Sequence, residues 1–164
     1  MPKIEQRLED LGISLPQPLQ LPPGVVLLFP WVRIVGTRAL ISGHVPTNQD
    51  GSLALPLGKV GRDLSLEQAY EAARLSGLAI LGSLQRELGS LDAIKGWTRI
   101  FGMVNSAPGF NNQPAVVNGC TELIIEVFGR EVGAHARSAV GVAELPSNVP
   151  VEIEGEVELH ESYA

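Results

Sequence analysis

One arginine near the C-terminus has the setting of a ligand-binding residue. Arg137 opens a run of small and apolar residues, 136–143, that has the composition of a β-strand. A guanidinium held by a rigid strand offers a carboxylate two parallel donors, which lysine cannot reproduce. Glu152 belongs to the next predicted strand, where its carboxylate could sit near Arg137. The pattern also suits a surface arginine at a strand end, so both interpretations stay open.

Other common reaction centres have no counterpart in the sequence. His44, His135 and His160 are far apart and have no cysteine or glutamate at metal-ligand spacing. The chain has no Walker loop, dinucleotide fingerprint or Gly-x-Ser-x-Gly elbow. Cys120 falls within a predicted helix, which favours a core or interface thiol over a nucleophile. We therefore expect no metal site and no cofactor.

Hydrophobic periodicity and turn residues predict the elements that position these side chains. The clearest is a helix over 65–88, where Ser65 and Gln68 form a capping-box pattern and Gly89 ends the run. A second helix is expected from Pro114 to about Val127, ended by Gly129. The other expected elements are a helix (3–11), a proline-rich arm (16–24), strands at 25–35 and 39–45 joined by a Gly36-Thr37 hairpin, a strand (94–104), a loop (105–113) and strands at 136–143 and 149–159.

This order of elements predicts an α+β domain with a single mixed sheet and two helices packed on one face. Pro30 cannot donate a ladder hydrogen bond, so the first strand should be an edge strand or be broken there. In the last strand, apolar residues alternate with four glutamates, which predicts one buried and one acidic face. The uncovered sheet face needs a partner, and oligomerisation is the simplest cover. We expect one domain over 1–164, with an N-terminal helix and arm (1–24) and a core (25–164).

Composition excludes several classes of partner. The chain of 164 residues carries a net charge of −6 and no basic cluster, which argues against a nucleic-acid partner. No stretch approaches the roughly 20 apolar residues of a membrane span. The single cysteine fits a reducing compartment, and the charged residues 1–10 contain no apolar signal core. We therefore expect a cytoplasmic protein with no membrane partner.

Several segments, taken in order, match one known family from Val25 onward. They are Ile41–Pro46 with its Ser-Gly-x-x-Pro pattern, Ile94-Lys95, Val117-Asn118, Ala136-Arg137-Ser138, the Val-x-Val-Ala-x-Leu-Pro run at Val140–Pro146, and Val151–Glu154. They resemble the Rid (reactive intermediate deaminase) family, also called the YjgF-like or L-PSP endoribonuclease family. The chain is most similar to a long-chain branch, whose marks here are Lys3–Leu11, Val104–Phe110, Gln113–Gly119 and His135–Val142.

The resemblance implies a chorismate-mutase-like fold and a homotrimer with three pockets at subunit interfaces. It also implies cofactor-free hydrolysis of reactive 2-imino acids to 2-oxo acids and ammonia. By position, Arg137 matches the arginine that holds the substrate carboxylate. Glu152 matches the glutamate that orients water or shuttles protons. The remaining pocket residues implied are Ser42, Gly43, Phe29, Trp31, Asn118 and Ala139.

Two pocket positions depart from the family pattern. Phe29 stands where a tyrosine is common, and Ala139 stands where many deaminases have a cysteine. The loop Asn105–Phe110 can also reshape the pocket entrance. The first hypothesis is therefore a deaminase of 2-imino acids or enamines. The alternative is a non-catalytic binding protein for small carboxylated metabolites. RNA cleavage, implied by the older family name, fits poorly with the acidic charge.

Overall fold

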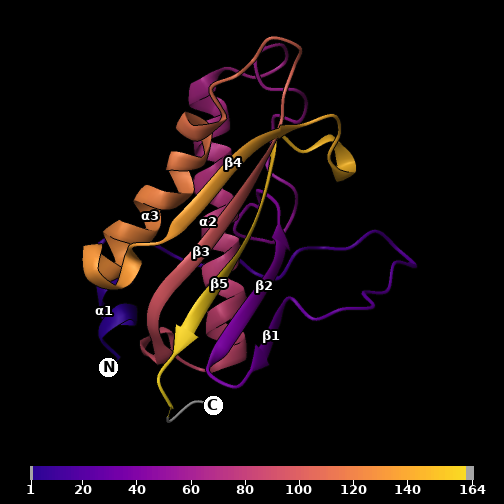
Figure 1. Ribbon diagram of the computed structural model, residues 1–164. Helices are drawn as coiled ribbons and strands as arrows, with labels where there is room; N and C mark the ends of the chain where they lie inside the picture. Colours follow the sequence, from indigo (N-terminus) through magenta and orange to yellow (C-terminus); the bar gives the residue numbers. More distant parts are fainter. Residues whose placement is uncertain (1, 162–164) are drawn as a thin grey trace.

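A five-stranded sheet carries the predicted site residues, and two long helices cover one of its faces (Figure 1). The computed structural model describes residues 2–161. Its elements are α1 (Lys3–Asp10), β1 (Val32–Val35), β2 (Arg38–His44), α2 (Leu66–Leu88), the 3-10 turn η1 (Leu91–Ala93), β3 (Ile94–Asn105), α3 (Gln113–Gly133), β4 (Ala136–Val142), the 3-10 turn η2 (Pro146–Asn148) and β5 (Val151–Leu159).

The strands lie in the order β1-β2-β5-β3-β4, with β1 and β4 at the two edges. Only the β3–β4 pair is parallel, because α3 carries the chain back across the sheet between these strands. The last strand, β5, is inserted between β2 and β3 and pairs antiparallel with both. The strand of Arg137 is therefore an edge strand, whereas the strand of Glu152 is central.

Local signals in the sequence determine the long helix α2 and its packing. The Ser65 hydroxyl accepts a hydrogen bond from the Gln68 backbone N–H, and Gln68 Oε1 accepts one from the Ser65 backbone N–H. The predicted capping box is confirmed. Gly89 ends the helix with a φ of 79°, as expected. At the contact with α3, a Cβ on Gly119 would overlap the Tyr70 carbonyl. The two helices approach this closely because one of them carries a glycine there.

The two faces of the sheet differ as the alternating pattern predicts. Val151, Ile153 and Val157 of β5 are buried in the core beneath the helices. The glutamates between them point to the other face, which we call the open face. This face also carries apolar side chains, among them Leu40 at 39% and Val140 at 37% relative exposure. Residues 2–161 thus leave apolar side chains of the open face exposed to solvent.

Two predicted elements are wrong in extent. The strand expected over 25–35 is reduced to β1, and residues 22–30 form a loop that projects from the body at the right of Figure 1. Pro30 and the proline pair at 22–23 explain this, because they cannot donate to a ladder. Helix α3 does not end at Gly129: this residue, with a φ of 76°, interrupts the helix, which then resumes for one turn to Gly133.

His44 links β2 to α2 through two hydrogen bonds. Its Nδ1 lies 2.7 Å from the Ser42 carbonyl oxygen and its Nε2 lies 2.8 Å from Ser83 Oγ. A carbonyl only accepts, so Nδ1 carries the proton and Nε2 accepts from the Ser83 hydroxyl. Burial is the main reason that the pKa of His44 falls to about 4, and the nearby Arg86 charge adds to it.

We expect His44 to make the fold sensitive to mild acid. Unfolding restores the pKa to about 6.5, so the unfolded chain takes up a proton that the folded chain refuses between pH 6.5 and 4. The free energy of unfolding should therefore fall through this range, by roughly 3 kcal/mol at most from this residue. Urea titrations of wild type and His44→Asn across pH 4–7.5 measure it. The fall in the free energy of unfolding that His44 causes should be present in the wild type and absent in His44→Asn. The control is His160→Asn, which replaces an exposed histidine and should keep the wild-type pH dependence.

Candidate functional site

Arg137 lies on the edge strand β4 and turns its side chain toward α3. Its register partner is Ile100, a buried residue of the helix-covered face. The guanidinium Nη1 lies 2.8 Å from Asn118 Oδ1 and 3.0 Å from Thr121 Oγ1, and Nη2 lies 3.3 Å from the Pro114 carbonyl oxygen. The first turns of α3 thus hold the half-buried arginine from one side.

The three acceptors that hold the Arg137 guanidinium are uncharged. Within residues 2–161, no carboxylate oxygen lies within 4 Å of the guanidinium, and its Nε makes no hydrogen bond. The positive charge is therefore fixed in place without a counter-charge. Such a group is suited to a ligand carboxylate.

A histidine and a cysteine flank Arg137. His135 Nε2 lies 3.1 Å from Thr121 Oγ1, and Nδ1 lies 2.7 Å from the Gly133 carbonyl oxygen. Burial first, and then the charge of Arg137, lowers the pKa of His135. Cys120 is fully buried, and burial raises the pKa of its thiol to about 12. Its interpretation as a core thiol is confirmed.

Ala139 follows Arg137 on the same face of β4. Its register partner is Gly102, where any Cβ would overlap the Val117 side chain of α3. The helix therefore comes close to the sheet beside Ala139, because Gly102 has no side chain. The structure thus brings together three predicted pocket residues: Arg137, Asn118 and Ala139.

Glu152 lies on the open face of the sheet, opposite Met103 in register. It is partly buried, and no hydrogen bond within the described residues involves its carboxylate. Burial, followed by the charge of Glu154, raises its pKa above the usual value. The carboxylate rests on Gly43, because a Cβ at that position would overlap Glu152 Oε1. The register shift between Ile41 and His44 marks a bulge that displaces the backbone there.

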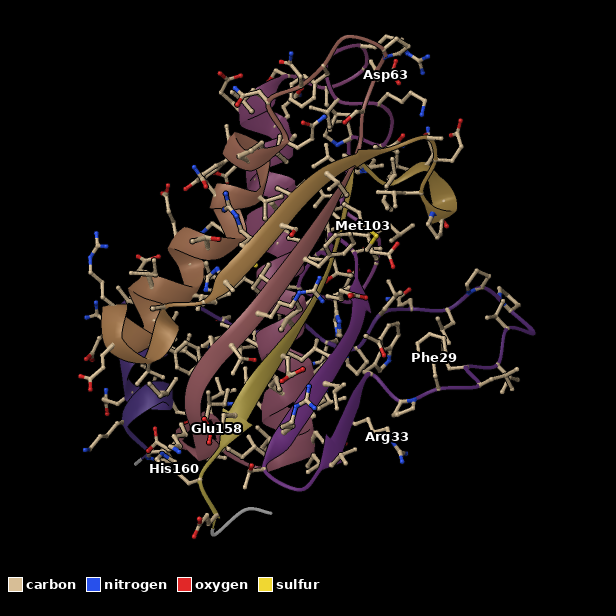
Figure 2. The ribbon with its side chains drawn as sticks, in the orientation of Figure 1. Phe29, Arg33, Asp63, Met103, Glu158 and His160 are labelled. Carbon is tan, nitrogen blue, oxygen red and sulfur yellow. The ribbon has the colours of Figure 1, made fainter. Side chains whose placement is uncertain are left out.

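The remaining predicted residues lie beside this second position. Ser42 Oγ donates to the Pro30 carbonyl oxygen at 2.8 Å, which fixes the end of the projecting loop. Phe29 is half exposed at that end (Figure 2), and its ring meets Trp31 edge-on at a centroid distance of 5.9 Å. Ser42, Gly43 and Glu152 form one group, with Phe29 at its edge. Trp31 instead packs on His44 and lines a small cavity with Ala79 and Ser83 of α2.

Within one chain, the structure does not bring Glu152 near Arg137. Arg137 faces the helices from β4, whereas Glu152 faces away from them on β5, and β3 lies between the two strands. The sequence pattern assigned each residue to a strand but did not give the order of the strands. The predicted pocket is thus divided into an arginine group and a glutamate group.

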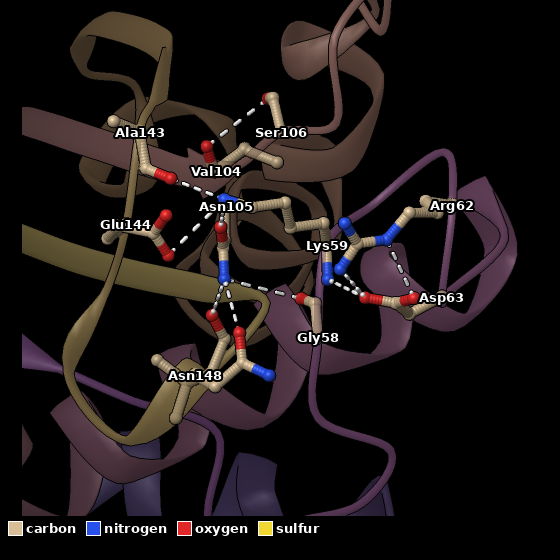
Figure 3. A network of polar contacts seen from close by, with 11 residues as sticks. Gly58, Lys59, Arg62, Asp63, Val104, Asn105, Ser106, Ala143, Glu144 and Asn148 are labelled. Atoms are coloured by element: carbon tan, nitrogen blue, oxygen red, sulfur yellow. Dashed lines mark hydrogen bonds and ion pairs between the residues drawn. The ribbon is translucent and has the colours of Figure 1, made fainter.

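A network that sequence reasoning missed fixes the connection between the strands of these groups (Figure 3). The fully buried Asn105 donates to Asn148 Oδ1 and to the Val149 carbonyl oxygen, each at 3.2 Å. Its own Oδ1 accepts from Lys59 Nζ at 2.7 Å, and Lys59 also bonds the Ala143 carbonyl and pairs with Glu144. The end of β3 is thereby tied to both ends of the β4–β5 turn.

Thr121 and His135 were also missed as members of the site. Thr121 follows Asn118 by three residues on α3 and so shares its face, a spacing that the sequence displays. His135 precedes Arg137 by two residues and was considered only as a metal ligand. In the described part of the chain, no three His, Cys, Asp or Glu side chains gather to hold a metal ion.

Comparison with protein families identifies the chain. The family model described as "YjgF/chorismate mutase-like, putative endoribonuclease" matches residues 6–153. The protein belongs to this family. Its five-stranded sheet and helices agree with the expected chorismate-mutase-like fold. No helix in residues 2–161 has the length and apolar character needed to cross a membrane.

Relatives cover nearly the whole chain of this YjgF-family protein. The Trypanosoma cruzi protein TCP17 is 37% identical over 160 residues, covering 96% of this chain and 95% of its own. A protein of unknown function from Agrobacterium tumefaciens is 38% identical, covers 96% and 94%, and superposes with a TM-score of 0.82. A "putative endoribonuclease" from Shewanella oneidensis is 29% identical, covers 96% and 99%, and has a TM-score of 0.86. Escherichia coli TdcF, solved with bound serine, shares the fold at 19% identity, 88% and 99% coverage and a TM-score of 0.57.

Proposed function

We propose that this protein hydrolyses reactive 2-imino acids or enamines to 2-oxo acids and ammonia, with the substrate carboxylate bound by Arg137. The observation that carries the proposal is the half-buried Arg137 guanidinium, which three neutral acceptors hold and which residues 2–161 leave without a counter-charge. Membership of the YjgF family supports it. TdcF, which shares the fold, holds serine, a ligand that carries a carboxylate.

The division of the pocket supports a site assembled from two copies of the chain. The arginine group lies at the β4 edge and the glutamate group on the open face near β2, so no single copy completes the pocket. In a closed ring, the arginine group of one copy can meet the glutamate group of the next, and each contact repeats around the axis. The exposed apolar residues Leu40 and Val140 on the open face favour such a ring.

We therefore expect a homotrimer in solution. Light scattering at micromolar concentration should give a mass close to three times 17.5 kDa. Introducing a charge into the open face, as in Leu40→Asp, should dissociate the assembly, because an unpaired carboxylate would be buried between subunits. The matched control is Leu55→Asp, since Leu55 is 78% exposed on a loop away from this face. A wild-type monomer would contradict the proposal.

The chemistry requires few groups. A protonated imine is already electrophilic at carbon, so no cofactor has to activate it. With the carboxylate fixed on Arg137, the imine carbon is presented to a single water molecule. Glu152 takes a proton from this water as the C–O bond forms, giving a carbinolamine. It then returns the proton to nitrogen and the C–N bond breaks. The carbinolamine hydroxyl gives its proton back to the ionised Glu152 as the carbonyl of the 2-oxo acid forms, and the departing ammonia takes that proton and leaves as ammonium.

A coupled assay tests the activity directly. A threonine or serine dehydratase generates the imino acid in place, and the appearance of 2-oxo acid is followed with and without this protein. Acceleration over spontaneous hydrolysis, lost in Arg137→Ala, is the expected result. Binding of 2-oxobutanoate without acceleration would favour a non-catalytic binding protein. This alternative draws on Ala139, which places a methyl group where many deaminases have a thiol.

RNA is not its substrate in this proposal, although relatives carry an endoribonuclease description. The net charge is −6, and β5 presents four glutamates away from the helices. Backbone phosphates would be repelled by such a surface. We expect no cleavage of single-stranded RNA above the level of a mock purification. Cleavage that follows the protein through purification and disappears in Arg137→Ala would contradict this.

A further inference from the structure

We propose that Thr121 and His135 are positioning residues, which lock the Arg137 guanidinium so that one edge of it stays free for the substrate carboxylate. This inference rests on the proposed function of Arg137 as carboxylate anchor. Neither residue has to touch the substrate. Their role is to determine which of the five donors of Arg137 remain available.

The contacts form a chain in which each donor and acceptor is determined. The Gly133 carbonyl can only accept, so His135 Nδ1 carries the proton across the 2.7 Å contact. His135 Nε2 must then be the acceptor at 3.1 Å, and the Thr121 hydroxyl donates to it. The same hydroxyl oxygen accepts from Arg137 Nη1 at 3.0 Å. Because burial and Arg137 both lower the pKa of His135, the ring stays neutral and able to accept at neutral pH.

This series of hydrogen bonds leaves one defined edge of the Arg137 guanidinium open. Both hydrogens of Nη1 are used, by Asn118 at 2.8 Å and by Thr121 at 3.0 Å. One hydrogen of Nη2 is directed to the Pro114 carbonyl oxygen at 3.3 Å. The donors left are Nε–H and one hydrogen of Nη2. With the Pro114 carbonyl on the Nη2 hydrogen that faces Nη1, these two donors lie side by side on one edge. This pair matches the two oxygens of a carboxylate.

The end of α3 supplies the last acceptor of this series of hydrogen bonds, the Gly133 carbonyl. Gly129, with a φ of 76°, interrupts the helix, and one further turn ends at Gly133. This turn packs tightly, since a Cβ on Gly133 would lie 3.1 Å from the Ile124 carbonyl oxygen. As a result, the Gly133 carbonyl lies beside His135, two residues before Arg137. The interruption at Gly129 therefore helps to place the acceptor that orients His135.

A similar chain elsewhere in the molecule supports this interpretation. His44 Nδ1 bonds the Ser42 carbonyl, His44 Nε2 bonds Ser83 Oγ, and Ser83 Oγ accepts from Arg86 Nη2 at 3.2 Å. Arg86 Nη1 is thereby aimed at the Pro16 carbonyl oxygen, 3.0 Å away, and secures the N-terminal arm. In both places, a neutral histidine and a hydroxyl orient an arginine. At Arg137 the open edge faces no acceptor from the described residues.

The test compares paired variants that keep or remove each acceptor. Thr121→Val removes the hydroxyl at constant shape, whereas Thr121→Ser keeps it. His135→Phe removes the Nε2 acceptor, whereas His135→Gln offers an amide oxygen at similar reach. Ser76→Ala is the control, because it removes a buried hydroxyl of α2 that has no hydrogen-bond partner.

Affinity for 2-oxobutanoate is measured by calorimetry, and KM and kcat by the coupled assay. We expect Thr121→Val and His135→Phe to weaken binding and raise KM about tenfold, with kcat little changed, as a misdirected charge-assisted bond would do. Thr121→Ser, His135→Gln and the control should bind as wild type does. Side-chain 15N spectra should show His135 as the Nδ1–H tautomer in wild type.

The outcomes separate this inference from the proposed function. If Arg137→Ala abolishes binding while Thr121→Val and His135→Phe bind as wild type does, the positioning role is wrong and the anchor role stands. Equal weakening in Thr121→Val and Thr121→Ser, accompanied by loss of thermal stability, would also overturn it in favour of a structural brace. If Arg137→Ala itself binds normally, the proposed function fails.

Discussion

Replacing Arg137 with alanine or lysine is expected to abolish most binding of small 2-oxo acids without dissociating or unfolding the protein. The guanidinium offers two parallel charge-assisted bonds to a carboxylate, and an ammonium offers only a point charge. Removing one partner of a desolvated charge pair costs roughly 2–5 kcal/mol, so the affinity should fall at least about tenfold. The three bonds that Arg137 makes to α3 are to uncharged acceptors, so their loss leaves no carboxylate buried and unpaired.

The measurement pairs calorimetry with pyruvate or 2-oxobutanoate and the mass in solution. Arg62→Lys is the matched control, because that arginine is exposed and already paired with Asp63 at 2.8 Å. A trimeric Arg137→Lys variant that binds as tightly as wild type would exclude the anchor role. Variants that dissociate or unfold would instead show that Arg137 braces the interface.

The parts of the fold that depend on near neighbours in sequence could be predicted. The capping box at Ser65 and the left-handed Gly89 determine α2 within a few residues, because both ends are local hydrogen-bonding events. The Gly36-Thr37 hairpin follows from two β-rich runs and a glycine with a φ of 59°. The alternation of apolar and acidic residues in β5 gave the correct buried face.

The division of the pocket depends on strand order, which local patterns do not contain. Periodicity tells which side of a strand faces the core, but it does not tell which strands are neighbours. Here β5 is inserted between β2 and β3, and this insertion places Glu152 on Gly43 and away from Arg137. The projecting loop at 22–30 was misread for a related reason, since its valines and leucines have strand composition but three prolines and Gly24 prevent pairing.

Family motifs identified some residues of the candidate site, whereas residues that belong to no motif were missed. Family motifs pointed to Arg137, Glu152 and Asn118 by position. Thr121 and His135 were missed because each is an ordinary residue whose role appears only when the end of α3 meets the start of β4. The Lys59–Asn105 network was missed likewise, since its members are 46 residues apart in the chain. Side chains that orient another side chain leave no motif of their own.

Replacing Glu152 with glutamine is expected to lower kcat for imine hydrolysis by roughly a hundredfold or more, the usual contribution of a general acid–base group. Binding of 2-oxobutanoate should change little, because the carboxylate is held by Arg137. Glutamine keeps the volume above Gly43 but can neither take the proton from water nor return it to the leaving nitrogen. Glu158→Gln is the control, since Glu158 lies near the far end of β5 and pairs with Lys95.

The pH dependence of kcat gives a sharper test of Glu152. A base must be ionised, so the wild-type rate should fall as the pH drops through the pKa of Glu152, which burial and Glu154 raise above 4.5. Glu154→Gln removes the neighbouring charge that helps to raise this pKa, so the acid limb should move to lower pH while the plateau rate is kept. Glu152→Gln should lose the limb altogether. An acid limb that stays in place in both variants would assign the proton transfer to another group.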